Sequence, residues 1–435
     1  MRVVEPAAAL VGDIAVPGVK GLCQRATLLA AIADGRSEIR GFGHAADTDA
    51  ALDVVRTLGA GVSEPSPGTI QIEGVGLRGL REPEGGVDCG NSGTVLRLLS
   101  GILAGQPGRF VLTGDDSLSH RPHERVAILL RQMGARITTT AGSCPVTIEG
   151  GPLHPSVYTL PVASAQVKSA ILLAGLLADS GPTTVIEPVP TRDHTERMLR
   201  SLGVRVQRAG SGISVWPVER IPPLDLDIPG DFSSVAPFLV GASLLASSDL
   251  RIHDVNLNPT RTGFLNVLDR MGARVAVYNR RSSGGEPVGD LEVRSAELVA
   301  TTIDSPEVPN VVDELPMFAL AAALARGESS VRGAEELRAK ESDRIETTTE
   351  ALHALGVRVT TASDGFSVRG VPTRFKGGAI STHADHRIAM LGGIAGLISR
   401  EGVEIDGPEC VAVSFPGFFE VLEEVARRDF IPDER

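Results

Sequence analysis

The sequence predicts an α/β protein of two similar domains, each built from three copies of one repeating unit. Three observations lead to this fold class: a glycine signature that ends a helix in unit after unit, a second series of buried-helix patterns with nearly the same spacing, and a length of 435 residues. A chain of that length suggests roughly three domains or two large ones.

A five-residue signature marks the end of a surface helix in each unit. It reads LGAGV, MGARI, LGVRV, MGARV and LGVRV, and the successive copies lie 75, 69, 69 and 84 residues apart. Glycine just past a helix end closes the last turn in a left-handed conformation. A short hairpin pattern such as VRVTTASDGFSVRG follows each copy. The signature glycines are Gly59, Gly134, Gly203, Gly272 and Gly356.

Six helical patterns rich in small residues form the second series. They begin near residues 22, 92, 164, 232, 313 and 385, again about seventy apart. They are apolar around almost their whole circumference, which predicts that they lie inside a helix bundle. Each unit is therefore a buried helix, a strand, a surface helix and a hairpin. The sixth unit is truncated and closes with FPGFFEVLEEVARR.

Six such units are too many for one hydrophobic core, so two domains of three units are predicted. The best candidate for a linker is the proline-rich stretch PVERIPPLDLDIPG over residues 217–230, because it falls between the third and fourth units.

The composition excludes several functional classes. Hydrophobic content of 42% and charged content of 22% are typical of a soluble globular protein. A net charge of −12 and an aromatic content of 3% argue against a nucleic-acid partner. No apolar stretch reaches the ~18 residues of a membrane span, and Glu5 and Asp13 interrupt any signal peptide. Four scattered cysteines form no zinc or redox motif, which indicates a reduced cytoplasmic setting.

Cations stand at or just before the start of many of the predicted helices. In LRAKESDRI, Lys340 and Arg344 precede the pattern IETTTEALHALG. A helix N-terminus is already positive, so cations are unfavourable there unless anions bind. GNSGT adds a loop of small residues that lets the backbone approach a ligand. The sequence therefore predicts a site for more than one small anion. The other cations at helix starts are Lys20, Arg25, Arg97, Arg121, Lys168, Arg192 and Arg387.

Two carboxylates among these cations are candidates for acid–base chemistry, Asp313 in VVDELP and Glu341 in AKESDR. From spacing alone, a structural role explains each residue as well as a catalytic one does. Asp313 could be an N-cap, and Glu341 could be one partner of a structural ion pair. His383 and His386 have metal-ligand spacing but are better assigned to the anion site. GVGLRG at 74–79 matches a dinucleotide-binding pattern, yet no helix pattern follows it, which excludes that interpretation.

A set of motifs runs in order along nearly the whole chain: PGVK, GNSGT, LTGDDSLSHRP, ASAQVKSAILLAGL, TRDHTERML, IPGDFSS, VVDELP, KESDR, DHR and SFPGF. Together they resemble the 5-enolpyruvylshikimate-3-phosphate synthase family. The resemblance implies an inside-out α/β barrel in which each domain has three βαβαββ repeats around buried helices. It also implies domains of 21–229 and of 1–20 plus 230–435, with the active site in the cleft between them.

The family transfers the enolpyruvyl group of phosphoenolpyruvate to the 5-hydroxyl of shikimate 3-phosphate and releases phosphate, in the pathway to chorismate and the aromatic amino acids. The resemblance implies two small anionic substrates and no metal or organic cofactor. It further implies a cytoplasmic monomer and inhibition by glyphosate, which competes with phosphoenolpyruvate beside Gly93.

The resemblance carries over individual residue roles. Asp313 takes the proton of the 5-hydroxyl, while Glu341 and Lys20 handle protons at the phosphoenolpyruvate carbons. The positions that match contacts to shikimate 3-phosphate are Lys20, Gly21, Arg25, Ser164, Ala165, Gln166, Arg192, Asp313 and Lys340. The positions that match contacts to phosphoenolpyruvate are Lys20, Asn91, Gly93, Arg121, Gln166, Arg344, His386 and Arg387.

The chain departs from the family pattern at a few positions. Gly21 stands where serine is usual, followed by Cys23 and Gln24, and Ala412 lies near the place of a lysine that many members carry. Three alternatives follow. They are a related transferase acting on another hydroxylated acid, one acting on UDP-N-acetylglucosamine, and a non-catalytic anion-binding module, which would have no need of both Asp313 and Glu341.

Overall fold

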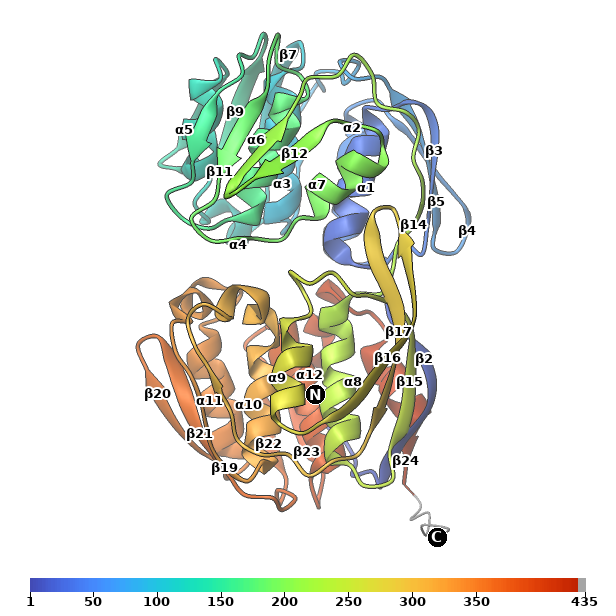
Figure 1. Cartoon of the computed structure of the whole chain (residues 1–435), viewed down its shortest axis with the longest axis vertical. Coiled ribbons are helices and arrows are strands. Elements are labelled where there is room, and N and C mark those ends of the chain that lie inside the picture. The colour runs from blue at the N-terminus through green and yellow to red at the C-terminus, as the bar shows by residue number, and fades with distance from the viewer. Residues whose placement is uncertain (429–435) are drawn as a thin grey trace. The chain divides into compact units, whose positions relative to one another are not determined.

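The computed structural model describes residues 1–428, and contacts within the chain divide it into two compact units (Figure 1). Unit 1 consists of Met1–Pro17, Pro229–Arg281 and the chain from Pro287 onward, and unit 2 of Gly18–Ile228 and Ser282–Glu286. The division after Ile228 falls inside the proline-rich stretch that the sequence indicates as a linker. The three residues Asp225–Asp227 of that stretch still form a strand of unit 2.

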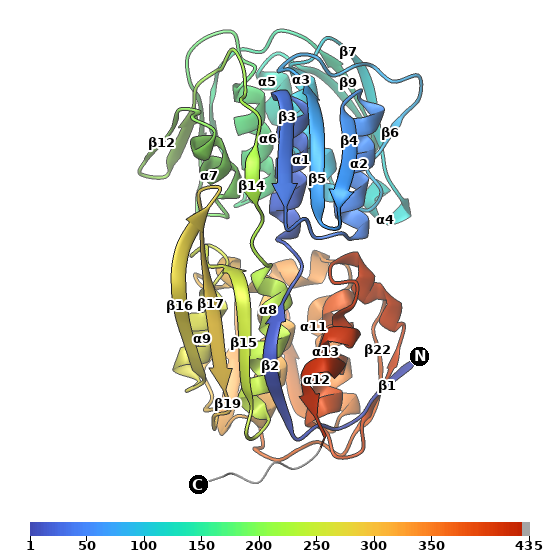
Figure 2. The ribbon, with the colours of Figure 1, turned by 90° about the vertical axis from the view of Figure 1, so that its right-hand side faces the viewer.

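Unit 2 contains three four-stranded sheets of identical topology, and Figure 2 shows the first of them face on. In each sheet a short edge strand pairs in parallel with its neighbour, and the remaining pairs are antiparallel. The first sheet is β14 (Asp225–Asp227), β3 (Asp34–Arg40), β5 (Thr69–Val75) and β4 (Gly61–Ser66). The second is β6 (Val87–Asp88), β7 (Gly108–Thr113), β9 (Ser143–Gly150) and β8 (Arg136–Thr140). The third is β10 (Val157–Thr159), β11 (Thr183–Ile186), β13 (Gly212–Val215) and β12 (Val206–Ala209).

Three buried helices form the core of unit 2. They are α1 (Lys20–Ala31), α3 (Gly93–Ala104) and α6 (Ala165–Gly175), and they begin within two residues of the predicted starts. Small residues let them touch, since a Cβ at Gly101 would lie only 2.1 Å from the carbonyl oxygen of Ala170. The surface helices are α2 (Ala46–Thr57), α5 (Glu124–Gln132) and α7 (His194–Ser201), with a short α4 (Asp116–Ser119).

Unit 1 repeats this plan with one truncated copy. Its first sheet is β16 (Arg274–Ser283), β17 (Glu286–Arg294), β15 (Asp249–Asn256), β2 (Ala9–Ala15) and β24 (Ala426–Arg427). The second is β18 (Thr302–Ile303), β19 (Gly327–Val331), β21 (Gly365–Gly370) and β20 (Arg358–Ala362). The third is β1 (Arg2–Val4), β23 (Val403–Asp406) and β22 (Gly378–Ser381). In this third sheet the N-terminal β1 pairs antiparallel with β23, where the other copies use a hairpin.

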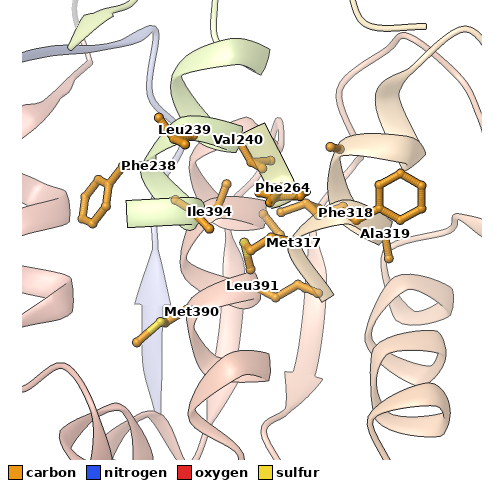
Figure 3. Packing of buried hydrophobic residues seen from close by; sticks show 14 of the residues in the cluster. Phe238, Leu239, Val240, Phe264, Met317, Phe318, Ala319, Met390, Leu391 and Ile394 are labelled. Carbon is orange, nitrogen blue, oxygen red and sulfur yellow. The ribbon is translucent and has the colours of Figure 1, made fainter. Parts of the chain in front are cut away.

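The core of unit 1 is built on α8 (Phe232–Leu244), α10 (Leu315–Leu324) and α12 (His386–Ile398). Figure 3 shows Phe238, Phe318 and Ile394 from these helices in one buried cluster. The surface helices are α9 (Gly263–Arg270), α11 (Arg344–Ala354) and α13 (Phe418–Val425). Four 3₁₀ turns complete the unit: η1 (Val308–Asn310), η2 (Val312–Glu314), η3 (Glu335–Ala339) and η4 (Pro408–Val413).

The glycine signature has the predicted role. All five glycines follow surface elements and have positive φ, between +79° at Gly203 and +103° at Gly59. A residue with a side chain is strained in that conformation, so glycine ends each helix here.

Two residue pairs with the sequence spacing of a capping box, Asp343 with Glu346 and Asp193 with Glu196, do not form one. Asp343 caps α11 by accepting hydrogen bonds from two backbone N–H groups, at 3.1 and 3.2 Å, but Glu346 pairs with Arg338 instead of closing the box. Asp193 forms no side-chain cap on α7, because its carboxylate accepts a bond from Arg197 Nε at 2.8 Å. A nearby arginine outcompetes the backbone in both cases.

Across residues 1–428, no helix is both long and apolar enough to cross a bilayer. Over the same part of the chain, histidine, cysteine and carboxylate side chains form no group of three that would hold a metal ion.

Candidate active site

The start of α1 carries the first predicted substrate-binding residues of unit 2. Lys20 is its first residue, and its Nζ lies 2.9 Å from a carboxylate oxygen of Asp47. Arg25, one turn further on, is 5% exposed and donates to the carbonyl oxygen of Gly21 and to Thr195 Oγ1, each at 2.7 Å. Burial lowers the pKa of Arg25 to about 10. This guanidinium therefore sits in a place where an additional anion is favoured.

The loop before α3 is held by Arg121. Its Nη2 donates to Asn91 Oδ1 at 2.8 Å and to Ser117 Oγ at 3.1 Å. Ser92 caps α3 by accepting from Val95 N at 3.2 Å. The helix N-terminus and an arginine thus meet at the GNSGT loop, an arrangement suited to an anion.

Gly93 and Gln166 meet through Arg97, which is 5% exposed. Gln166 Oε1 accepts a bond from Arg97 Nη1, and Gln166 Nε2 donates to Thr94 Oγ1 at 2.8 Å. A Cβ at Gly93 would lie 3.0 Å from Arg97 Nη1. Burial lowers the pKa of Arg97 to about 9, and the charges of Arg125 and Arg121 act in the same direction.

The remaining predicted residues of unit 2 lie at the starts of α6 and α7. Ser164 is the N-cap of α6 and accepts from Val167 N at 3.4 Å, and Ala165 is the first helical residue. Arg192 is partly buried, two residues before α7.

Lys168 does not belong to the anion site that the sequence suggested. Its side chain is fully buried, and its Nζ lies 3.0 Å from Glu187 and 2.7 Å from Glu196. Two buried carboxylates already neutralise it, so its position near a helix start is structural.

In unit 1, Asp313 lies in η2, immediately before α10. Its Oδ2 is 3.1 Å from Arg261 Nη1, and its Oδ1 is 3.5 Å from Arg344 Nη1. The N-cap of α10 is Glu314, so the N-cap interpretation of Asp313 is wrong by one residue. Asp313 is instead a carboxylate held between two buried guanidinium groups.

Arg344 opens α11 and is 2% exposed. It lies 2.8 Å from Glu341 and 2.8 Å from Asp385, which are the strong, charge-assisted kind of hydrogen bond. Burial alone would lower the pKa of Arg344, but the charges of Glu341 and Asp385 raise it above its usual value. Glu341 therefore forms the ion pair that the sequence offered as its structural alternative. Its side chain is also 34% exposed, so it is open to solvent.

The start of α12 adds the last predicted residues. Asp385 caps the helix by accepting from Arg387 N at 2.9 Å, His386 is 3% exposed, and Arg387 Nη1 donates to the carbonyl oxygen of Ser233 at 3.2 Å. Lys340 pairs with the exposed Glu336 at 2.7 Å.

His383, which the sequence also assigned to the anion site, has another partner. It lies 3.0 Å from Glu350 of α11, and 40% of its side chain is exposed.

Sequence reasoning missed Arg261 and Asp385. The role of Asp385 as an N-cap could have been predicted, because aspartate is a preferred N-cap residue and this one stands directly before a helical pattern. Arg261 lies in NPTRTG between β15 and α9, where no periodic pattern marks it. Only the tertiary fold brings it to Asp313.

Comparison with known proteins places this arrangement in a known class. The fold is shared with the enolpyruvyl transferase NikO from Streptomyces tendae, at a TM-score of 0.77 and 20% identity, covering 97% of this chain and 96% of that one. The chain therefore has the fold of this enolpyruvyl transferase.

The chain belongs to the EPSP synthase (3-phosphoshikimate 1-carboxyvinyltransferase) family, whose model matches residues 4–422. The 3-phosphoshikimate 1-carboxyvinyltransferase of Salinibacter ruber is 47% identical over 98% of this chain and 99% of its own length. That of Halorhodospira halophila is 49% identical over 97% and 95%. The structure of EPSP synthase from Acinetobacter baumannii matches with a TM-score of 0.90 at 43% identity, covering 98% of both chains.

Proposed function

We propose that the site residues described above for unit 2 and for unit 1 bind the substrates and carry out the family's reaction. In that reaction the enolpyruvyl group of phosphoenolpyruvate is transferred to the 5-hydroxyl of shikimate 3-phosphate, and phosphate is released. The enzyme is a transferase of the shikimate pathway. The observation that carries the residue assignment is Asp313, a carboxylate held between Arg261 and Arg344 in the unit that also carries Lys340 and Arg387.

In the addition step, Asp313 accepts the proton of the 5-hydroxyl while the hydroxyl oxygen bonds to C2 of phosphoenolpyruvate. Glu341 or Lys20 delivers a proton to C3, so the double bond is consumed and a tetrahedral intermediate forms. In the elimination step a proton leaves C3 and the bond from C2 to the phosphate oxygen breaks. Each proton transfer of this kind contributes roughly 10²–10⁴ in rate.

The cations of both units neutralise the substrates. Arg25, Arg192 and Lys340 are assigned to shikimate 3-phosphate, together with Gly21 and the Ser164–Gln166 segment. Arg121, Arg344 and Arg387 are assigned to phosphoenolpyruvate, together with Asn91, Gly93, Gln166 and His386. Arginine suits this role because it grips carboxylate and phosphate with two parallel bonds.

Phosphate release from phosphoenolpyruvate, measured with and without shikimate 3-phosphate, tests the proposal. Release that requires shikimate 3-phosphate supports it. Release with UDP-N-acetylglucosamine, or only with another hydroxylated acid, would move the assignment to one of the other transferase activities. In the same assay the Asp313→Asn variant should lose roughly 10²-fold or more of its activity, and full activity would refute the assigned base.

We further place the enzyme in the cytoplasm as a monomer. The cysteines of residues 1–428 are all unbridged, as expected in a reducing compartment. Cell fractionation and the sedimentation of the purified protein test the two statements separately, and a sedimentation mass of twice 45.5 kDa would overturn the second.

A further inference from the structure

Arg261 is a buried arginine in unit 1 to which the mechanism above gives no role. It lies on the loop between β15 and α9 and is 7% exposed. Its Nη1 is 3.1 Å from Asp313 Oδ2, and its Nη2 lies 2.5 Å from Ser233 Oγ and 3.4 Å from Asp231 Oδ1. The guanidinium fork therefore ties the proposed base to the first turn of α8.

Each oxygen of Asp313 faces its own guanidinium. Oδ1 faces Arg344, which is shared with Glu341 and Asp385 and is assigned to phosphoenolpyruvate. Oδ2 faces Arg261, whose Nη2 is paired with Ser233 and Asp231 rather than with a residue assigned to a substrate. Because Arg261 holds Oδ2, it fixes the orientation of the carboxylate whichever partner Oδ1 has.

A second acid lies beside this pair. Glu314 is 2% exposed, and one of its carboxylate oxygens accepts a bond from Ser233 Oγ. Burial raises the pKa of Glu314, against the opposing charges of Arg261 and Arg387. Burial alone would lower the pKa of Arg261, but Asp231, Glu314 and Asp313 raise it above its usual value. Arg261 is thus the main countercharge of three crowded carboxylates.

We propose that Arg261 is a positioning residue for catalysis: by holding Oδ2 it fixes the orientation of the Asp313 carboxylate toward the 5-hydroxyl, and it supplies positive charge among the acidic neighbours of that carboxylate. The inference rests on the proposed role of Asp313 as the base. The charged groups that face Asp313 or its partners from the elements around η2 are Arg261, Arg344, Arg387, Asp231, Glu314, Glu341, Asp385 and His386.

The test compares Arg261→Gln and Arg261→Lys with the wild type in the full-length enzyme. We expect Arg261→Gln to lower kcat by about 10- to 100-fold, a fraction of the effect of losing the base itself, with KM for both substrates changed only a few-fold. The acid limb of the kcat profile should move to higher pH, because carboxylates that lose a neighbouring cation take up a proton more readily. Arg261→Lys keeps the charge but loses the fork, so kcat should fall while the acid limb stays near its wild-type position.

Arg270→Gln is the matched control. Arg270 ends α9 in the same unit and pairs at 2.7 Å with Glu307, but it is exposed and touches no proposed site residue. Its replacement should leave both kcat and the pH profile unchanged. Thermal unfolding and calorimetric binding of shikimate 3-phosphate establish that each variant is folded. If Arg261→Gln does not fold, Arg261→Lys carries the test, and a wild-type kcat in that variant overturns the proposal.

A double variant separates this inference from the assignment of Asp313. In the Asp313→Asn background, Arg261→Gln should lower kcat by no more than a few-fold further, because residues that act as a unit are not additive. A full multiplicative loss, or an unshifted acid limb in the single variant, overturns the positioning role alone. A fully active Asp313→Asn enzyme refutes the proposed base itself.

Discussion

The two units start their buried helices in different chemical ways. In unit 2 the N-caps of α1, α3 and α6 are uncharged: Val19, Ser92 and Ser164. In unit 1 the N-caps of α8, α10 and α12 are all acids: Asp231, Glu314 and Asp385. The same fold therefore presents a positive helix end in one unit and a carboxylate in the other.

This difference divides the chemistry between the units. An acid at a helix start is stabilised by the helix dipole, and in unit 1 buried arginines neutralise these acids further. In unit 2 the cations add to the positive helix ends, and the pKa of Arg25 and that of Arg97 are both lowered by burial. On the proposed assignments, unit 2 contributes mainly anion-binding groups, while unit 1 adds to its own cations the carboxylates Asp313 and Glu341 for proton transfer. Substitutions of the two unit 1 carboxylates should therefore act mainly on kcat, and those of the GNSGT loop and the arginines of unit 2 mainly on binding.

The largest effect is expected from the carboxylates of unit 1. Asp313→Asn and Glu341→Gln should each lower kcat by roughly 10² or more, the usual scale of general acid–base catalysis. Binding of shikimate 3-phosphate, measured by calorimetry, should largely survive in Glu341→Gln. Glu307→Gln, which removes an exposed carboxylate of the same unit, is the control. Near-normal turnover in both site variants would contradict the proposal that the carboxylates of unit 1 carry out the proton transfers.

A methyl group in the unit 2 loop should affect binding of an inhibitor more than binding of substrate. A Cβ at Gly93 would meet Arg97 Nη1 at 3.0 Å and Leu118 Cδ1 at 3.5 Å, so Arg97 must shift and carry Gln166 with it. Overpacking of this kind costs about 1–3 kcal/mol, or roughly 5- to 150-fold in affinity. We expect Gly93→Ala to weaken glyphosate inhibition by a factor in that range.

The KM for phosphoenolpyruvate should rise far less in Gly93→Ala, because the inhibitor is the longer molecule. Inhibition constants of the wild type and the variant, measured side by side, check this. A wild type that already resists glyphosate, with no further resistance in the variant, would show that Gly93 does not control the pocket.

The repeat pattern made most of the fold predictable. Helix-ending glycines and apolar helices are local signals, and both recur often enough to give the number of units and the starts of α1, α3 and α6 within two residues. The capping details were not predictable in the same way. Asp193 and Glu346 each had an arginine partner, Arg197 and Arg338, that no spacing rule selects over the backbone.

Candidate site residues that stand at helix starts were predictable from the sequence. Those that depend on tertiary contacts were not. Asn91 and Arg121 were named separately and prove to be hydrogen-bonded. Lys168 had the same sequence signal as the proposed site cations, yet Glu187 and Glu196 come from other elements and pair with it. Carboxylates distant in sequence decide whether a cation is free for a ligand, and one sequence does not reveal that pairing.

A smaller effect is expected from a cation of unit 2. Arg121→Lys loses the bonds to Asn91 and Ser117, since lysine lacks the planar fork. Hydrogen bonds to charged groups contribute about 1.5–3 kcal/mol, so KM for phosphoenolpyruvate should rise at least roughly tenfold. Steady-state kinetics should show kcat within a few-fold of the wild type. Arg131→Lys, which alters a pair with Glu124 on α5, is the control, and a loss confined to kcat would contradict the division of roles between the units.

The smallest effect concerns Gly21, where family members usually carry serine. A Cβ at this position would lie 3.2 Å from Arg25 Nη1, which already donates to the Gly21 carbonyl oxygen. Gly21→Ser therefore adds a hydroxyl worth about 0.5–1.5 kcal/mol but presses on a proposed ligand of the substrate. We expect shikimate 3-phosphate to bind more tightly, by no more than several-fold.

Gly21→Ala separates the two contributions, because it adds the Cβ without the hydroxyl. Calorimetry should find that the alanine variant binds shikimate 3-phosphate more weakly than the wild type, since Arg25 must shift, and that the serine variant binds it several-fold more tightly than the alanine variant. The ratio between the two variants isolates the hydroxyl, whatever the displacement of Arg25 costs. Equal affinities of the serine and alanine variants would mean that no substrate group meets this hydroxyl, and the assignment of Gly21 to the shikimate 3-phosphate site would then be wrong.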